Sequence, residues 1–212
     1  MMITIIQELS QPYCVHTRNP VAMTYNKLFS FVRTALPCLG AAAIIFLSMP
    51  AEAADWRDKI LDNDRCLTLH RPETKEVSSF CYWRKNTGID VQGYRKANWI
   101  LRDWQDNKQV VMDIHLLNTL FVMQRWLIIE GRSGEIQILS GYRTPGHNAK
   151  LDGAAKQSQH LNGKAADLYI PAVSTRLLAA MSRLIGVGGV GIYPNKNYVH
   201  VDTGNVRTWV KR

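Results

Sequence analysis

Apolar and polar residues alternate on both sides of the short segment RPETK, residues 71–75. The alternation runs through CLTLH before this segment and through EVSSFCYW after it. A period of two is typical of β-strands, so the stretch predicts a β-hairpin with the polar segment at its turn. His70, at the edge of the turn, is expected to lie in solvent.

A different pattern begins after Asp113, where apolar residues recur at the spacing of an α-helix. Leu117 and Phe121 are four residues apart and share one helical face. Asp113 is a suitable N-cap for this helix, and Gly131 can end it. His115, in the first turn, is expected on the surface.

The second half of the chain alternates short strands with loops and one more helix. A strand is predicted over 135–139, followed by a polar loop through SGYRTPGHN, and AADLYIP predicts a second strand that Pro171 ends. Ser174 can cap a helix that Gly186 stops, and GVGGVGIYP and NYVHVDTG predict two closing strands. The predicted fold class is α+β, a single compact domain with a small antiparallel sheet and flanking helices.

The first 54 residues have the features of an export signal. Lys27 and Arg33 precede an apolar run over 34–49, and the sequence AEA follows it, with cleavage expected near Ala53 or Ala54. Translation that starts at Met23 would give a signal of more ordinary length. We therefore divide the chain into a leader, residues 1–54, and a domain, residues 55–212; an uncleaved membrane anchor is the alternative.

The chain is basic, with a formal net charge of +9. Removal of residues 1–53 takes away three basic and two acidic residues, so the mature domain keeps a charge of +8. A basic exported protein suits an anionic wall polymer or lipid headgroups better than nucleic acid. A basic surface without any partner is the alternative.

Two cysteines, Cys66 and Cys81, flank the predicted hairpin. In an oxidising compartment, cysteines on neighbouring strands of a hairpin are expected to form a disulfide. A zinc site at these cysteines is disfavoured because no second closely spaced ligand pair accompanies them.

Candidate chemistry gathers on the last predicted strands. Tyr198, His200 and Asp202 alternate along one strand and therefore share a face, and QSQHLNGKAADLYI places His160 seven residues before Asp167. Two histidines and a carboxylate would leave a tetrahedral zinc ion with one open position, the arrangement of catalytic sites. Spacing alone is a weak signal for a metal site, and a loop histidine with a turn-capping aspartate is the alternative.

Four sequence blocks, SGYRTPGHN, SQHLNGKAADLYIP, GVGGVGIYP and YVHVDTGNVRTW, occur in the order found in a known family. The chain resembles the zinc D-Ala-D-Ala peptidases and, within them, the exported murein endopeptidases of Gram-negative bacteria. The resemblance runs from about Cys66 to Trp209. It implies a fold like that of hedgehog and the D-Ala-D-Ala peptidases.

Residue by residue, the resemblance implies zinc ligands at His160, Asp167 and His200. Arg143 takes the position of the substrate-binding arginine, whose guanidinium would contact a peptide carbonyl or carboxylate; a loop salt bridge is its alternative role. Ser158 is expected to shape the substrate cleft.

The general base departs from the family pattern. Positions where relatives carry an acidic residue or a histidine hold Asn197 and Tyr198 here, and neither side chain is a base at neutral pH. Asp202 would either accept the proton or orient His200, and both roles stay open. His147 is expected in a solvated loop.

Tyr193 and Tyr198 would line the cleft or simply pack. The resemblance implies a Zn²⁺-dependent, periplasmic endopeptidase that acts on peptidoglycan stem peptides, with no nucleic-acid partner and no membrane span after signal cleavage. A D,D-carboxypeptidase that trims terminal D-Ala and a non-catalytic peptidoglycan-binding module are the alternative functions.

Overall fold

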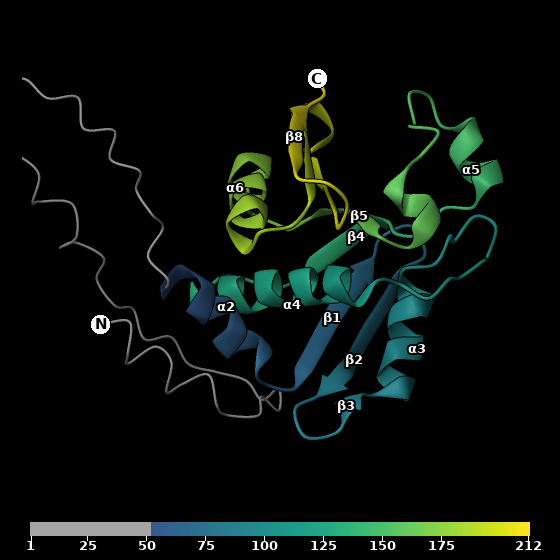
Figure 1. Ribbon diagram of the computed structural model, residues 1–212. Helices are drawn as coiled ribbons and strands as arrows, with labels where there is room; N and C mark the ends of the chain where they lie inside the picture. The colour runs from purple at the N-terminus through teal and green to yellow at the C-terminus, as the bar shows by residue number, and fades with distance from the viewer. Residues whose placement is uncertain (1–51) are drawn as a thin grey trace, which may run out of the picture. The chain divides into compact units, whose positions relative to one another are not determined.

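An eight-stranded mixed sheet organises residues 52–212, the part of the chain that the computed structural model describes (Figure 1). The strand order is β3-β2-β1-β4-β5-β7-β6-β8. The strands are β1 (Arg65–Arg71), β2 (Glu76–Arg84), β3 (Gly88–Ile89), β4 (Ile136–Ser140), β5 (Ala165–Tyr169), β6 (Gly189–Tyr193), β7 (Tyr198–Asp202) and β8 (Arg207–Val210). Nearly all of the expected leader lies outside the described residues.

The α+β class is confirmed, but the expectation of a small antiparallel sheet is wrong. The predicted hairpin is β1 and β2, which pair antiparallel, and β1 also pairs in parallel with β4, as β6 does with β8. The β1–β4 pairing joins residues more than 60 positions apart across two helices, and local periodicity carries no sign of such a contact. The short strands β3 and β8 contain too few residues to show an alternation.

Asp113 and Ser174 cap helices as their positions in the sequence predict. The Asp113 side chain accepts a hydrogen bond from the His115 N–H, and Ser174 accepts one from the Leu177 N–H. Gly186 ends its helix at a φ of 84°, a left-handed conformation that glycine adopts without strain. The helices are α2 (Glu52–Leu61), α3 (Val91–Ile100), α4 (Ile114–Ile129), α5 (Pro145–Lys150) and α6 (Thr175–Ile185), with 3₁₀ turns η2 (Gln159–Asn162) and η3 (Pro194–Lys196).

The segment after β4 is partly a helix instead of the expected polar loop. Thr144 caps α5, its side chain accepting from the His147 N–H, and Pro145 occupies the first helical turn. Proline is favoured there because its fixed φ suits a helix and its missing N–H would have had no helical partner. A six-residue helix is too short to show apolar periodicity, so the sequence pattern did not reveal it.

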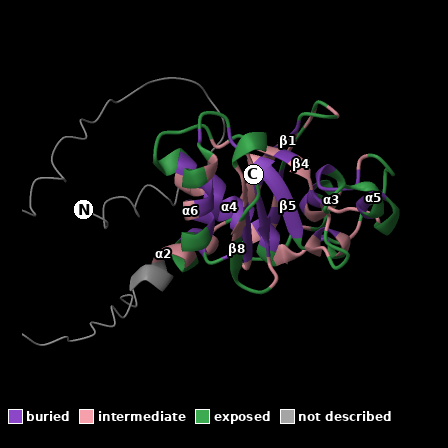
Figure 2. Cartoon of the chain, turned by 90° about the horizontal axis from the view of Figure 1, so that it is seen from above, coloured by how far each residue is buried: buried purple, intermediate pink, exposed green. Residues whose placement is uncertain are grey.

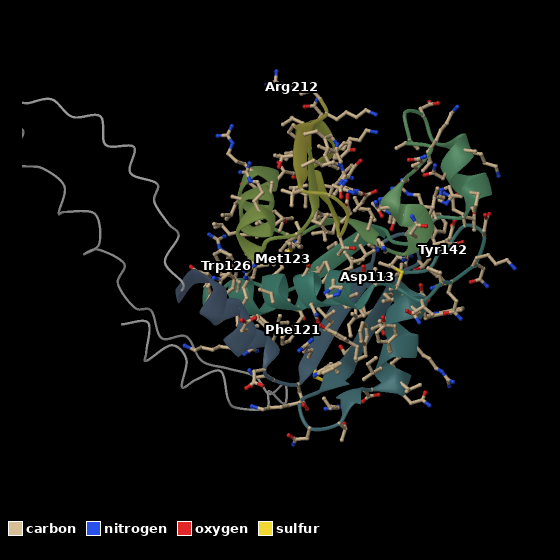
Figure 3. All side chains as sticks on the ribbon, in the orientation of Figure 1. Asp113, Phe121, Met123, Trp126, Tyr142 and Arg212 are labelled. Atoms are coloured by element: carbon tan, nitrogen blue, oxygen red, sulfur yellow. A yellow bond between two sulfur atoms is a disulfide. The ribbon has the colours of Figure 1, made fainter. Side chains whose placement is uncertain are left out.

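The helix α4 runs through the core and is buried nearly all round, as the central purple helix of Figure 2 shows. It packs against β1 and α6. Phe121 and Met123 lie on opposite sides of the helix (Figure 3) and are 3% and 0% exposed. Apolar side chains all round are typical of a helix enclosed on every side.

Buried Gln124 of α4 completes the hydrogen bonding of β1. Its side-chain amide accepts from the Thr68 N–H (3.1 Å) and donates to the Thr68 carbonyl (2.9 Å). The parallel contact with β4 begins only at Leu69, so the glutamine pairs main-chain groups that would otherwise be buried without partners.

The hairpin is cross-linked, since Cys66 and Cys81 lie opposite each other on β1 and β2 and their sulfurs form a disulfide. Among residues 52–212, no helix combines the length and apolar character needed to cross a bilayer.

Candidate metal centre

Three side chains from separate elements converge on one face of the sheet. Asp167 of β5 lies directly opposite His200 of β7 in the antiparallel register, so both side chains project from the same face. His160 lies on η2, which leads into β5 through Gly163, where a φ of 65° reverses the chain. Residues forty positions apart thus meet because two paired strands and one short turn hold them.

The candidate ligand atoms lie close to one another on buried residues. His160 Nε2 is 3.1 Å from His200 Nδ1 and 3.2 Å from Asp167 Oδ1, and His200 Nδ1 is 2.8 Å from the same carboxylate oxygen. Tetrahedral coordination with zinc–ligand bonds of ~2.0–2.1 Å places neighbouring ligand atoms about 3.3 Å apart. Among the described residues, this is the one group of three or more such side chains that could hold a metal ion.

The outer nitrogen of each imidazole already has a partner. His160 Nδ1 donates to the Gly141 carbonyl (2.6 Å) and His200 Nε2 donates to Asp202 Oδ2 (2.8 Å). When both rings are neutral, each turns a lone pair toward Asp167, and three acceptors converge on one point. Lone pairs at these distances repel unless a cation lies among them. The two nitrogens and the carboxylate oxygen therefore fit as ligands of a metal ion such as zinc.

The electrostatics of the two imidazoles differ. Burial lowers the pKa of His160, which favours its neutral form. Burial opposes protonation of His200 too, but hydrogen bonds to Asp167 and Asp202 outweigh it and raise the pKa of this histidine. A bound cation would take the place of the proton that these carboxylates attract.

Arg143 lies beside the centre and contacts it directly. Its Nη2 donates to Asp167 Oδ2, the carboxylate oxygen that faces away from the histidines, and its Nε donates to Ser140 Oγ (2.8 Å). The guanidinium thus makes the salt bridge that was the alternative role for this residue, and it does so at the edge of the candidate site.

Asp202 is fully buried and its carboxylate is already bound on both oxygens. Besides His200, it accepts from both Nη atoms of Arg207 (2.7 and 3.1 Å) and from the Gly189 and Gly204 N–H groups. Burial alone would raise the pKa of Asp202, but these hydrogen bonds hold it well below its usual value. The carboxylate contacts the ring edge of His200 opposite to the ligand atom.

Aromatic rings border His200. Tyr193 and Tyr198 stack with centroids 4.4 Å apart, and Trp209 of β8 donates its indole N–H to the Tyr193 hydroxyl (3.3 Å). The indole ring lies 5.3 Å from the His200 ring. The two tyrosines therefore pack together, half-buried, next to the centre.

Sequence reasoning gave Arg207 and Trp209 no role, although alternate glycines in β6 point to them. A Cβ on Gly191 would come within 2.6 Å of the Trp209 ring, and one on Gly189 within 2.3 Å of Asp202 Oδ2. Two glycines two residues apart in a strand indicate close packing on one face. They leave room for the indole and for the Asp202–Arg207 pair.

Three other residues singled out in the sequence, Ser158, Asn197 and His147, do not contact the candidate ligand atoms with their side chains. Ser158 caps η2, its hydroxyl accepting from the His160 N–H (3.3 Å), and exposed Asn197 ends η3. The expectation of a solvated His147 is wrong. This residue is 8% exposed, and its Nδ1 lies 2.9 Å from both oxygens of Asp103, because α5 folds onto the loop after α3.

Comparison with known proteins agrees with this geometry. A family profile described as "Peptidoglycan L,D-endopeptidase MepK" matches residues 59–209. The peptidoglycan L,D-endopeptidase MepK of Escherichia coli K12 is 32% identical over 190 residues, which cover 85% of this chain and 98% of that protein. The probable peptidoglycan L,D-endopeptidase MepK of Haemophilus influenzae is 37% identical over 126 residues, 58% of this chain and 67% of the relative.

No solved structure matches the chain significantly. The family profile, however, spans most of the chain, and the Escherichia coli relative is matched over almost its whole length. The chain therefore belongs to the peptidoglycan L,D-endopeptidase MepK family.

Proposed function

We propose that this protein is an exported zinc endopeptidase that hydrolyses peptide cross-links of peptidoglycan. The observation that carries the proposal is the convergence of His160 Nε2, Asp167 Oδ1 and His200 Nδ1 within 3.2 Å in a chain of this family. Because the relatives are named L,D-endopeptidases, the bond we propose joins an L-centre to a D-centre of the stem peptides.

The three ligand residues would hold the metal, with His160 and His200 neutral and Asp167 ionised. Zinc, when bound, acts as a Lewis acid and lowers the pKa of its bound water toward ~7. The protein fixes one tautomer of each histidine. Gly141 accepts the outer N–H of His160 and Asp202 that of His200, which leaves the inner nitrogens free to ligate.

Arg143 has the position to bind substrate at this centre. Its guanidinium lies against Asp167 and is 13% exposed, so a peptide carbonyl that reaches the ligand atoms also reaches this arginine. A fixed positive charge there stabilises the negative charge that develops on the carbonyl oxygen as water adds.

Of the two roles for Asp202, we assign it the orientation of His200. Its carboxylate faces the outer nitrogen of that ring and is enclosed by Arg207 and two main-chain N–H groups, so it has no free oxygen to accept a further proton. Tyr193, Tyr198 and Ser158 would border the substrate.

We also propose that residues 1–54 are a leader and that residues 55–212 act in the periplasm. The disulfide between Cys66 and Cys81 supports an oxidising compartment, since such bonds are rare in the reducing cytosol. The chain's net charge of +9 suits an anionic wall polymer.

Digestion of purified cross-linked muropeptide dimers tests the activity. The wild-type protein with zinc is expected to convert L,D-linked dimers to monomers, whereas His160→Ala loses both zinc and turnover. His115→Ala, the same change at an exposed histidine of α4, is the matched control and should behave as the wild type does.

Each alternative function has its own outcome in this digest. Dimers shortened by one D-Ala would identify a carboxypeptidase instead of an endopeptidase. Intact dimers that nevertheless bind the protein would identify a non-catalytic wall-binding module. Full turnover by zinc-free His160→Ala would refute the metal mechanism.

A further inference from the structure

A cavity of about 250 Å³ adjoins the candidate metal centre and shares Arg143 with it. Two other arginines, Arg71 and Arg102, line it together with Asp103 and Tyr142. The main chain of Tyr142, which Figure 3 labels, donates to the Leu101 carbonyl just after α3. Pockets for drug-sized ligands run to ~300–1,000 Å³, so this one suits a single chemical group and its attached residue.

Arg71 reaches this cavity from the end of β1 and is only 1% exposed. Its Nε donates to the Ile100 carbonyl (2.9 Å) and its Nη2 to the Arg102 carbonyl (3.1 Å). Its Nη1 has no hydrogen-bond partner among the described residues. Holding the end of α3 explains two of the three nitrogens and leaves the third unexplained.

An unpaired buried donor on a charged group is costly, and native proteins rarely leave one without a reason. Burial, and then the neighbouring positive charge of Arg102, lower the pKa of Arg71 to about 10. The guanidinium is therefore still charged at neutral pH, in a place that disfavours its charge. An anion bound at Nη1 would relieve both costs.

Carboxylates of the protein do not meet this need. Arg143 pairs with Asp167 and Arg102 with Glu76, but among the described residues Arg71 donates to main-chain carbonyls alone. Asp103 also lines the cavity.

Both oxygens of Asp103 are already engaged. They accept from the Thr144 and Gln105 N–H groups and contact His147 Nδ1. Glu73, the remaining acidic residue of the lining, is exposed to solvent. Glu73, Glu76 and Asp103 attract the charge of Arg71, but none of them accepts a hydrogen bond from its Nη1.

We propose that this cavity is a subsite for a free carboxylate of the stem-peptide substrate, which Arg71 Nη1 binds while Arg143 contacts the scissile group. The inference rests on the proposed function. Arginine suits a carboxylate because its N–H groups make short, charge-assisted hydrogen bonds in a fixed geometry. The shared Arg143 places the recognised carboxylate close to the bond that is cut.

Two carboxylates of a stem peptide have the required chemistry, the one at its C-terminus and one on a side chain within it. Dimers amidated at one or the other carboxylate distinguish the two, because a carboxamide has nearly the same size as a carboxylate and carries no charge. The zinc-loaded wild-type enzyme is expected to cut one of the two amidated dimers with about 10- to 100-fold lower kcat/KM than the free acid.

Arg71→Gln is the decisive variant. It is expected to cut the free acid and that same amidated dimer at equal rates, and Arg95→Gln, a change at an exposed arginine of α3, should keep the wild-type ratio. The ratio compares two substrates on one protein, so a loss of stability in the variant does not alter it.

Calorimetric binding of uncross-linked stem peptide, acid against amide, gives a readout that needs no hydrolysis. A wild-type enzyme indifferent to both amidations, or an Arg71→Gln variant that keeps the discrimination, would overturn the subsite while the endopeptidase function stands. A wild-type enzyme that neither cuts nor binds any stem peptide would overturn both the subsite and the endopeptidase function.

Discussion

At the scale of single residues, Asp202 holds the outer nitrogen of His200, a candidate metal ligand. Its carboxylate accepts the His200 Nε2–H at 2.8 Å and is itself held by Arg207. An orienting carboxylate contributes ~10- to 100-fold to metal affinity. Asp202→Asn is therefore expected to weaken zinc binding by about this factor, with activity that returns as zinc is added.

Competition with a chromophoric chelator measures the zinc affinity, and muropeptide digestion at rising zinc measures the rescue. Asp152→Asn, at an exposed aspartate, is the control. An Asp202→Asn enzyme that binds zinc normally yet stays inactive at any zinc concentration would instead identify Asp202 as the proton acceptor.

At the scale of elements, short-range signals were predictable and long-range pairings were not. Asp113 and Ser174 were recognisable as caps because a capping side chain bonds an N–H two or three residues away. The parallel β1–β4 contact and the burial of His147 depend on residues more than 40 positions apart, which leave no local pattern.

The candidate site divides in the same way. The candidate ligands His160, Asp167 and His200 stood out through the spaced motifs that carry the family resemblance. Arg207 and Trp209 did not, because their importance lies in contacts across β6, β7 and β8. The glycines at alternate positions of β6 were the one local trace of that packing.

The disulfide of the β1–β2 hairpin is expected to stabilise the fold. The Cys66–Cys81 disulfide closes a loop with a sequence separation of 15, and in the chain-entropy view such a loop contributes ~3 kcal/mol by restricting the unfolded state. The double variant Cys66→Ser/Cys81→Ser is expected to lose about 3 kcal/mol of unfolding free energy, or roughly 6–12 °C in Tm.

Thermal unfolding with and without a thiol reductant checks this value. Reductant should lower the Tm of the wild type to that of the double variant and leave the double variant unchanged. Equal Tm values for the two proteins without reductant would contradict a stabilising role for the bond.

At the scale of the whole molecule, the candidate metal centre joins elements that are remote in the chain. The three candidate ligands come from η2, β5 and β7. Arg143, from the segment after β4, contacts Asp167, and Arg207, from the last strand, contacts Asp202. An ion held there binds the folded chain and not the unfolded one, so its binding free energy adds to the stability of the fold.

Removal of the metal should therefore destabilise the whole domain as well as abolish turnover. At zinc 1,000-fold above its Kd, binding adds about 4 kcal/mol, so a chelator is expected to lower the Tm by roughly 8–16 °C. Readded zinc should restore it. His160→Ala should begin near the lower Tm and not respond to chelator, while His115→Ala should respond as the wild type does. A wild-type Tm that changes with neither chelator nor zinc would mean that the three converging acceptors hold no ion. An ion that binds the folded state alone must stabilise that state.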